Sequence, residues 1–252
     1  MKQLFRLIVP VLIWLRFDKF LLSLSSNNML ILVYHGVSHN PDRHNMNIDQ
    51  FRKDIKYLSK NFNIIPLETM FKVYQSGGRY SNKTISITFD DGFCNSIIAT
   101  DILDGIPATF FVTGLSTLSG TRRIVDRLLL DYHQLKRLSE VKGVTIGCHS
   151  KHHSDYATMS LKSVEVDMIQ TKQDIESVIG KPCDFIAYTY GSYNEEIKDK
   201  ATKIGHKYQL AVKYKSPLDK RDQRIMPRHC VSNTTTHSSN MLQICNAFRN
   251  GI

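Results

Sequence analysis

The stretch from Leu30 to Tyr34 reads LILVY, a continuous apolar run that is typical of a strand buried on both faces. Strands of this kind occur mainly in parallel sheets whose two faces are covered by helices. Further along the chain, short β-rich runs alternate with longer runs that have apolar residues at helical spacing. This alternation predicts βαβ units around a parallel sheet.

The expected elements follow one another along almost the whole chain. Strands are expected at residues 30–34, 62–65, 84–89, 108–113, 144–148, 185–188, 208–213 and 225–231, and helices at 48–61, 67–75, 95–103, 128–140, 160–179, 195–204 and 240–248. Because we find no internal repeat and no linker, we predict a single α/β domain built as a closed barrel, with an open doubly wound sheet as the alternative. No GxGxxG or Walker-type loop follows a strand, which argues against nucleotide binding.

The composition indicates a globular protein with a basic surface. The 252 residues are 42% hydrophobic and 22% charged, and the formal net charge is +10. A basic surface attracts nucleic acid, anionic lipid or acidic glycans, although solvated lysine faces explain the charge equally well. No nucleic-acid-binding module is recognisable, so we expect no nucleic-acid partner. The five cysteines include no CxxC pair, which favours reduced thiols over a disulfide framework or a cysteine zinc site.

The first 28 residues differ from the remainder, so we divide the chain into a segment at 1–28 and a domain at 29–252. Residues 1–24 combine an apolar run at 7–15 with flanking basic residues, and the run is too short to span a bilayer. The segment can lie on a membrane as an interfacial helix, pack against the domain or act as an uncleaved signal anchor for export. We expect peripheral membrane contact, and therefore a cytoplasmic or membrane-associated protein.

Polar side chains gather at the points where expected strands end. In chain order they are His35, Asp90, Asp91, His149, His153 and Tyr190. Each motif alone has an ordinary explanation, such as turn chemistry for Asp-Asp-Gly. The carboxyl ends of the strands in a parallel barrel share one face, however, and active sites are built there. We therefore expect these side chains to converge on one active site.

The residue types in this group suit metal-assisted hydrolysis. His149 and His153 are four residues apart, a spacing that brings two side chains together on one helical turn. Two neutral imidazoles and one carboxylate bind a divalent ion and leave positions open for water and substrate. Adjacent Asp90 and Asp91 suit a division of labour, in which one carboxylate is a ligand and the other is a base.

Four motifs resemble one known family. Residues 88–92 (TFDDG) resemble the TFDDG signature of the polysaccharide deacetylases, carbohydrate esterase family four, and residues 149–153 (HSKHH) resemble the HS/TxxH motif of that family. Residues 108–114 (ATFFVTG) resemble its next strand, and residues 187–191 (AYTYG) the AYPYG segment of one branch. The resemblance covers the chain from about residue 30 to about residue 231.

This resemblance implies a distorted (β/α)₇ barrel, with 29–252 as a NodB-like catalytic domain. It implies hydrolysis of an N-acetyl group, or less often an O-acetyl group, on a sugar, polysaccharide or lipid-linked glycan. By motif position, Asp90 is the general base, and Asp91, His149 and His153 bind a divalent metal. Zn²⁺ is expected, with Co²⁺, Ni²⁺ and Mn²⁺ as alternatives. The backbone N–H of Tyr190 is expected to stabilise the oxyanion. The expected partner is a carbohydrate, and no oligomeric state is predicted.

The chain departs from the family pattern at two motifs. Ala187 stands where the RxPY motif has its Arg, and Thr189 replaces the second Pro. We expect Arg228 to replace the missing Arg beside the base, with a purely structural Arg as the alternative. The late LxH motif is also absent. His35, in the YHGV segment at 34–37, is therefore expected to protonate the leaving amine, with His229 as the rival acid.

Two other functions are left open by the sequence. One is a catalytically altered relative that binds glycans, and the other is a metal-dependent amidase or esterase acting on a non-sugar substrate. Asp90 argues against the first, because a pure binder needs no base beside the metal. The net charge and the segment at 1–28 favour a lipid-linked or membrane-proximal anionic substrate.

Overall fold

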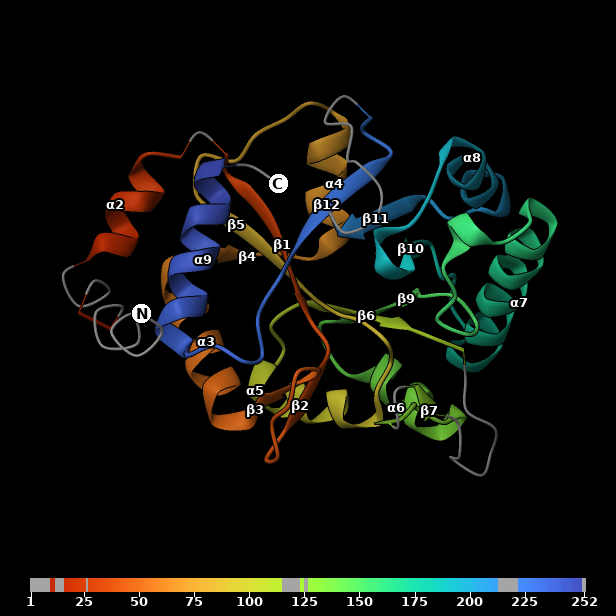
Figure 1. Ribbon diagram of the computed structural model, residues 1–252, viewed down its shortest axis with the longest axis horizontal. Coiled ribbons are helices and arrows are strands. Elements are labelled where there is room, and N and C mark those ends of the chain that lie inside the picture. The colour runs from red at the N-terminus through yellow and green to blue at the C-terminus, as the bar shows by residue number, and fades with distance from the viewer. Residues whose placement is uncertain are drawn as a thin grey trace.

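The computed structural model describes residues 10–11, 16–25, 27–114, 123–124, 127–212 and 222–250. Within these residues, seven parallel strands form a closed ring, which confirms the predicted barrel and excludes the open sheet (Figure 1). In ring order they are β1 (Met29–Tyr34), β12 (Ile225–Cys230), β11 (Tyr208–Val212), β10 (Phe185–Ala187), β9 (Val144–Cys148), β6 (Ala108–Val112) and β5 (Thr84–Phe89). The ring closes because β5 pairs with β1 along its whole length.

The ring is distorted at β5, which has two neighbours on one edge. Its first two residues pair with the short strand β4 (Asn63–Ile64), and its last three pair with β6. On its other edge, β1 runs beside β5 for six residue pairs, whereas β1 and β12 share only two. The most continuous part of the ring is therefore the pair of strands that ends at Tyr34 and Phe89, directly before His35 and Asp90.

Helices surround the ring (Figure 1). They are α2 (Phe17–Ser23), α3 (Ile48–Asn61), α4 (Leu67–Gln75), α5 (Ile98–Leu103), α6 (Tyr132–Glu140), α7 (Leu161–Ile179), α8 (Glu195–Ile204) and α9 (His237–Asn250). Several of their ends follow from local side-chain chemistry. The Asn47 side chain caps α3 by accepting two backbone N–H groups, and Asp131 forms a capping box with Gln134 at the start of α6. Gly180 ends α7 in a left-handed conformation.

The interior of the barrel is apolar at its amino-terminal end. The interior cluster consists of Ile31, Phe111, Phe185, Ala187, Tyr208, Leu210 and Met226, together with Leu67, Met70 and Phe71 of α4. The ring of Phe71 lies 5.1 Å from that of Tyr208, the first residue of β11. Tyr74 Oη donates a hydrogen bond of 3.4 Å to the carbonyl of Ile225, the first residue of β12. Helix α4 thus covers the amino-terminal end of the barrel, and the polar residues lie at the opposite end.

Some element boundaries differ from the prediction for local reasons. The helix expected at 128–140 begins at Tyr132, because Asp131 caps it and the short strand β8 (Arg127–Leu128) precedes it, paired with β7 (Arg123–Ile124). The helix expected at 95–103 begins as a 3₁₀ turn before α5, and the last helix begins three residues earlier than predicted. The short parallel pair β2 (Gly36–Ser38) and β3 (Asn45–Asn47) was not predicted, since three-residue strands carry no readable periodicity.

Helix α2 packs against α9 and the second half of α3. Leu21 and Leu22 are buried in the main apolar cluster, and the buried Asp18 accepts a hydrogen bond from Tyr57 Oη. Residues 1–9 and 12–15, which belong to the segment predicted to contact a membrane, lie outside the described residues. No helix in the described part of the chain is long and apolar enough to cross a membrane.

We expect the buried His206, which follows α8, to make the fold less stable in acid. Burial, assisted by the charge of Lys172, lowers the pKa of His206 from 6.5 to about 3. Between these two pH values, His206 is protonated in the unfolded chain but not in the folded chain. The free energy of unfolding therefore falls as the pH drops below 6.5. The loss is about 1.4 kcal/mol per pH unit, or roughly 2–3 kcal/mol at a pH near 4.5.

Urea unfolding at neutral and acidic pH would measure this effect. The His206→Leu variant is expected to lose that part of the pH dependence, whereas His133→Gln, at an exposed position of α6, should behave as the wild type does. Equal pH slopes in wild type and His206→Leu would contradict the assignment.

Candidate active site and metal centre

The Asp-Asp-Gly turn after β5 directs its two carboxylates toward different partners. Asp91 and Gly92 both have left-handed backbone conformations, with φ of 73° and 70°. A Cβ atom at Gly92 would lie 3.0 Å from the Val112 side chain, so the turn needs glycine for space as well as for conformation. Asp90 consequently pairs with Arg228, whereas Asp91 faces two histidines.

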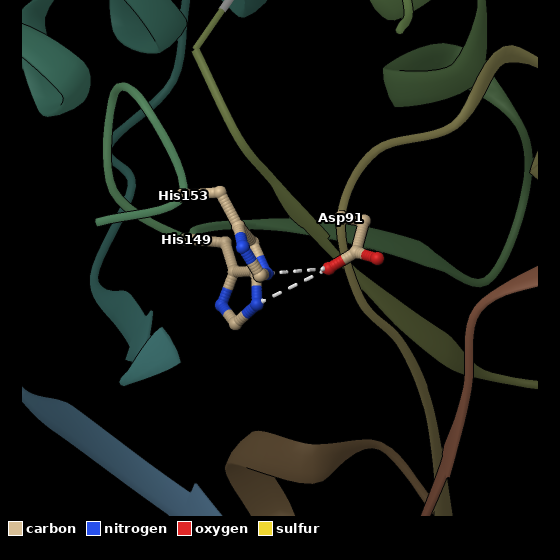
Figure 2. Close-up of side chains that lie close together, drawn as sticks. All are labelled: Asp91, His149 and His153. Atoms are coloured by element: carbon tan, nitrogen blue, oxygen red, sulfur yellow. Dashed lines mark ion pairs between the residues drawn. The ribbon is translucent and has the colours of Figure 1, made fainter. Parts of the chain in front are cut away.

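His149 and His153 converge on the carboxylate of Asp91 (Figure 2). Asp91 Oδ1 lies 3.5 Å from His149 Nε2 and 3.1 Å from His153 Nε2. One ligand atom from each of the three residues lies within 4.8 Å of the other two. Bonds of about 2.0–2.1 Å to a tetrahedral ion place ligand atoms roughly 3.3 Å apart, close to the two distances between Asp91 Oδ1 and the histidine nitrogens. The three residues therefore fit a divalent metal ion.

The other nitrogen of each imidazole is held by a neighbour. His149 Nδ1 lies 2.8 Å from the carbonyl oxygen of Ala187, and His153 Nδ1 lies 3.0 Å from Tyr190 Oη. An Nδ1–H donated to such an oxygen fixes the tautomer in which Nε2 carries the lone pair. Both rings then present Nε2 toward Asp91, which is the arrangement that a pair of metal ligands requires.

The two histidines lie on a loop and not, as their spacing suggested, on one turn of a helix. β9 ends just before His149, and Ser150 and His153 have left-handed φ of 60° and 55°. The loop is held from α7, where Asp167 accepts the backbone N–H of Lys151 at 2.9 Å. The histidines meet because the loop folds back, so helical spacing was the wrong physical reason for their proximity.

Backbone strain is concentrated around these residues. In the described part of the chain, the non-glycine residues with positive φ are Arg16, Asp91, Asp104, Ser150, His153 and Tyr190. Asp91 and His153 are candidate ligands themselves, Ser150 follows the ligand His149, and Tyr190 contacts His153. Each such conformation costs about 1–3 kcal/mol and persists only where the surroundings impose it, a pattern typical of functional sites.

Asp90 is paired with Arg228, which lies buried inside the barrel. Two N–H···O bonds of 2.7 and 2.8 Å join the side chains in a bidentate arrangement, and the guanidinium lies 5.1 Å from the centroid of the Phe111 ring. Burial alone would raise the pKa of Asp90, but the charges of Arg228 and His149 outweigh it and lower that pKa. Asp90 is therefore a buried carboxylate that stays ionised, 3.8 Å from His149 Nε2.

The charges of the ligand cluster depend on one another. Burial would raise the pKa of Asp91, but hydrogen bonds from His149 and His153 hold it well below its ordinary value. For His149 burial acts in the other direction and would lower the pKa, but the carboxylates of Asp90 and Asp91 outweigh burial and raise it. A proton and a metal ion therefore compete for the same nitrogen of His149.

The two candidates for the general acid lie in different environments. His35 directly follows β1. Its electrostatic interaction with Asp90 and Asp91 lowers the pKa of both carboxyls, whereas their burial acts to raise it. Its Nδ1 is buried and has no hydrogen-bond partner among the described residues. His229 adjoins Arg228 on β12, so its side chain points to the opposite face of the barrel wall. The geometry therefore places His35, and not His229, beside the two aspartates.

Tyr190 lies at the rim of the site with 40% of its surface exposed. Its ring is edge-on to that of His153, with 4.8 Å between the centroids. The turn is tight, because a Cβ atom at Gly191 would lie 1.9 Å from the carbonyl oxygen of Val212. The motif directed attention to the Tyr190 backbone, and no sequence pattern indicated that its hydroxyl meets His153.

His44 is a residue near the site that no sequence pattern indicated. Its ring lies 6.3 Å from those of both His35 and Phe93. Burial lowers the pKa of His44, the charge of Arg127 lowers it further, and Asp91 opposes them. The stretch between β2 and β3 has no periodicity, and only its density of charged residues could have marked it.

Comparison with known proteins gives a family and two curated relatives. The sequence profile of the family described as polysaccharide deacetylase matches residues 77–209. A chitin deacetylase from a Pestalotiopsis species is 30% identical over 114 residues, which cover 44% of this chain and 35% of that protein. The peptidoglycan-N-acetylmuramic acid deacetylase PdaA of Bacillus subtilis (strain 168) is 27% identical over 135 residues, which cover 51% of this chain and 46% of that protein. The chain thus matches less than half the length of each relative.

Two solved structures share the fold over most of their length. The deacetylase PplD of Streptococcus pyogenes, in complex with acetate, has a TM-score of 0.68 at 19% identity, covering 85% of this chain and 96% of its own. IcaB from Ammonifex degensii has a TM-score of 0.74 at 17% identity, covering 88% of this chain and 99% of its own. At these identities the similarity establishes the barrel alone.

Proposed function

The chain belongs to the polysaccharide deacetylase family, and from this premise we propose that it hydrolyses an N-acetyl group of a glycan at the site around Asp90 and Asp91. One observation carries the proposal. A cluster of three potential ligands, with their atoms within 4.8 Å, lies beside a buried carboxylate that Arg228 holds bidentately. Glycan binding alone would require neither feature. The reaction adds water across the amide C–N bond, releases acetate and leaves a free amine on the sugar.

In this proposal Asp91, His149 and His153 hold the metal ion. The ion would polarise the acetyl carbonyl and lower the pKa of a water molecule. Two imidazoles and one carboxylate suit Zn²⁺, and Co²⁺, Ni²⁺ or Mn²⁺ can replace it. The Ala187 carbonyl and Tyr190 Oη orient the two rings, since partners of this kind fix both the tautomer and the direction of a ligating imidazole.

Asp90 and His35 are the proposed base and acid. Arg228 keeps Asp90 ionised, so Asp90 can accept a proton from the attacking water molecule. His35 lies at the end of the neighbouring strand, where Tyr34 pairs with Phe89, and would donate a proton to the departing amine nitrogen. The backbone N–H of Tyr190 is proposed to stabilise the charge that develops on the carbonyl oxygen.

Three substrates separate this proposal from its rivals. The full chain with Zn²⁺ would be incubated with acetylated chito-oligosaccharides, O-acetylated xylan and 4-nitrophenyl acetate, and acetate and new amines would be measured. We expect acetate and amine in equal amounts from the chito-oligosaccharides. Binding without acetate release would indicate a catalytically altered relative. Release from O-acetylated xylan or 4-nitrophenyl acetate, with none from the chito-oligosaccharides, would indicate an esterase. Binding without release, or release from the ester substrates only, would overturn the proposal.

Removing the Tyr190 hydroxyl is expected to weaken metal binding. In Tyr190→Phe the His153 ring loses its partner at 3.0 Å, whereas the backbone at residue 190 is kept. The dissociation constant for Zn²⁺ should rise about 10-fold, the lower end of the effect of losing such a partner. Competition with a chromophoric chelator would measure it. The matched control is Tyr80→Phe, whose exposed hydroxyl bonds to the Thr69 carbonyl far from the site, and equal affinities in both variants would contradict the expectation.

A further inference from the structure

Exposed apolar side chains are concentrated near the start of the described chain. The exposed large apolar residues among those described are Val11, Phe17, Phe20, Leu24, Leu128, Val141, Val166 and Tyr190, and half of them fall between residues 11 and 24. Phe17, Phe20 and Leu24 have the i, i+3, i+7 spacing of one helical face, and we call them the α2 apolar face. Phe20 and Leu24 are 54% and 53% exposed, and the rings of Phe17 and Phe20 lie 5.7 Å apart.

Other side chains of α2 anchor the helix, so the exposure does not come from a detached helix. Leu21 and Leu22 are buried against the body of the protein. Lys19 Nζ donates to Asn61 Oδ1 at 2.5 Å, at the end of α3, and Tyr57 of the same helix donates to Asp18. The fold therefore holds the α2 apolar face outward in a fixed orientation.

The surroundings of this face are basic. The exposed cations that adjoin α2 in the sequence, or lie on the helix that α2 contacts, include Arg16 and three lysines of α3, Lys53, Lys56 and Lys60. The acids in 16–25 and 53–61 are Asp18 and Asp54. Both are buried, and they pair with Tyr57 and His237 respectively. The charge that these two stretches present to solvent is therefore positive.

We propose that the α2 apolar face and the cations of α3 form a binding surface for an anionic lipid bilayer. A narrow apolar stripe with flanking basic residues inserts at the boundary between headgroups and acyl chains, and the cations are attracted to acidic headgroups. Three side chains on two helical turns are far fewer than the 20–30 residues a side, about 800 Å², that stable protein interfaces use. The chemistry of the surface thus matches a bilayer better than a second protein.

The α2 surface is separate from the candidate site. Helix α2 contacts Tyr57 and Asn61, in the half of α3 that leads into β4 at the amino-terminal end of the barrel. The candidate site lies at the carboxyl ends of the strands. The surface that α2 provides and the candidate site therefore lie toward opposite ends of the barrel.

Vesicle sedimentation of the full chain tests the proposal. We expect binding to phosphatidylcholine vesicles that contain phosphatidylglycerol, reduced by salt, and little binding to phosphatidylcholine alone. Phe17→Ser with Phe20→Ser should lower the partition coefficient about 10-fold or more. Lys56→Glu with Lys60→Glu should abolish the preference for anionic vesicles. The matched control is Val166→Ser, at an apolar position of α7 that is 45% exposed, which should bind as wild type does.

Several outcomes would overturn the bilayer proposal. They are a wild type that sediments with neither vesicle, and variants of both kinds that bind as tightly as the wild type. A concentration-dependent dimer in light scattering that is lost in the Phe17 and Phe20 variant, without vesicle binding, would assign the surface to a second copy of the chain. Acetate release from a soluble oligosaccharide should be unchanged in both variants, so failure of this inference and failure of the proposed function are separate results.

Discussion

Replacement of Asp90 by Asn is expected to lower kcat for acetate release by about 10²–10⁴-fold, because an amide cannot take the proton of the attacking water. The amide has nearly the shape of the carboxylate, and its oxygen can still accept one N–H group of Arg228. Asp91, His149 and His153 are unchanged, so one Zn²⁺ per chain should still bind. The loss should therefore appear in kcat, while the metal content stays the same.

Acetate release and metal content, measured on the same preparation, would check this prediction. Asp101→Asn, an exposed position on α5, is the matched control and should keep full activity. Full activity in Asp90→Asn would remove Asp90 from the role of base. Loss of bound Zn²⁺ in that variant would instead show that Asp90 is a ligand.

Replacement of Arg228 by Met is expected to affect both stability and the pH profile. The variant leaves the buried Asp90 carboxylate without its counter-charge, a change that costs about 3–5 kcal/mol of unfolding free energy at neutral pH. In the wild type, the charges of Arg228 and His149 outweigh the effect of burial and lower the pKa of Asp90. Without Arg228, burial raises that pKa, so the acid limb of the pH–activity profile should move to higher pH.

The stability lost in Arg228→Met should also change with pH in a defined direction. In the wild type, the lowered pKa of Asp90 contributes stability that is lost as the pH falls through that pKa. In Arg228→Met the pKa is raised, so the destabilisation relative to wild type should shrink as the pH falls and Asp90 becomes protonated. Urea unfolding at several pH values and the pH dependence of kcat would measure both effects.

A conservative variant separates the charge of Arg228 from its geometry. Arg228→Lys keeps the positive charge but loses the planar pair of donors that holds both oxygens of Asp90. It should restore most of the pH profile and only part of kcat. An Arg228→Met protein with an unchanged acid limb would show that Arg228 is structural and does not tune the base.

The parts of the site that follow strands were predictable, because strand ends can be read locally. Because Asp90 and Asp91 directly follow an apolar run, the sequence places them at the carboxyl end of a strand. In the closed ring, this end of β5 lies on the same face as the loop after β9. The proximity of His149 and His153 was predicted for a different reason from the one found, since the loop is not helical. Residue types and strand order were therefore better guides than local conformation.

Contacts across the barrel were harder to derive from the residues themselves, and Arg228 was expected beside Asp90 only by comparison with the family pattern. Arg228 reaches Asp90 only because β1, between β5 and β12, closes the ring, and the residues are 138 apart along the chain. Alternation along β12 decides that Arg228 faces inward and His229 outward, but the register of a single strand was not readable beforehand. The contact of Tyr190 with His153 depends on one side-chain rotation at the surface, which no motif encodes.

The most direct test of the proposed metal-dependent deacetylation is a metal titration of the chelated full chain, with acetate release from an acetylated chito-oligosaccharide as the readout. We predict no release without metal, and a rise that saturates at one Zn²⁺ per chain, because Asp91, His149 and His153 supply one set of ligand atoms. The variant His149→Ala should show no such saturation at the same concentrations. Acetate release that persists in the chelated protein, or activity in His149→Ala that follows the wild-type curve, would contradict this mechanism.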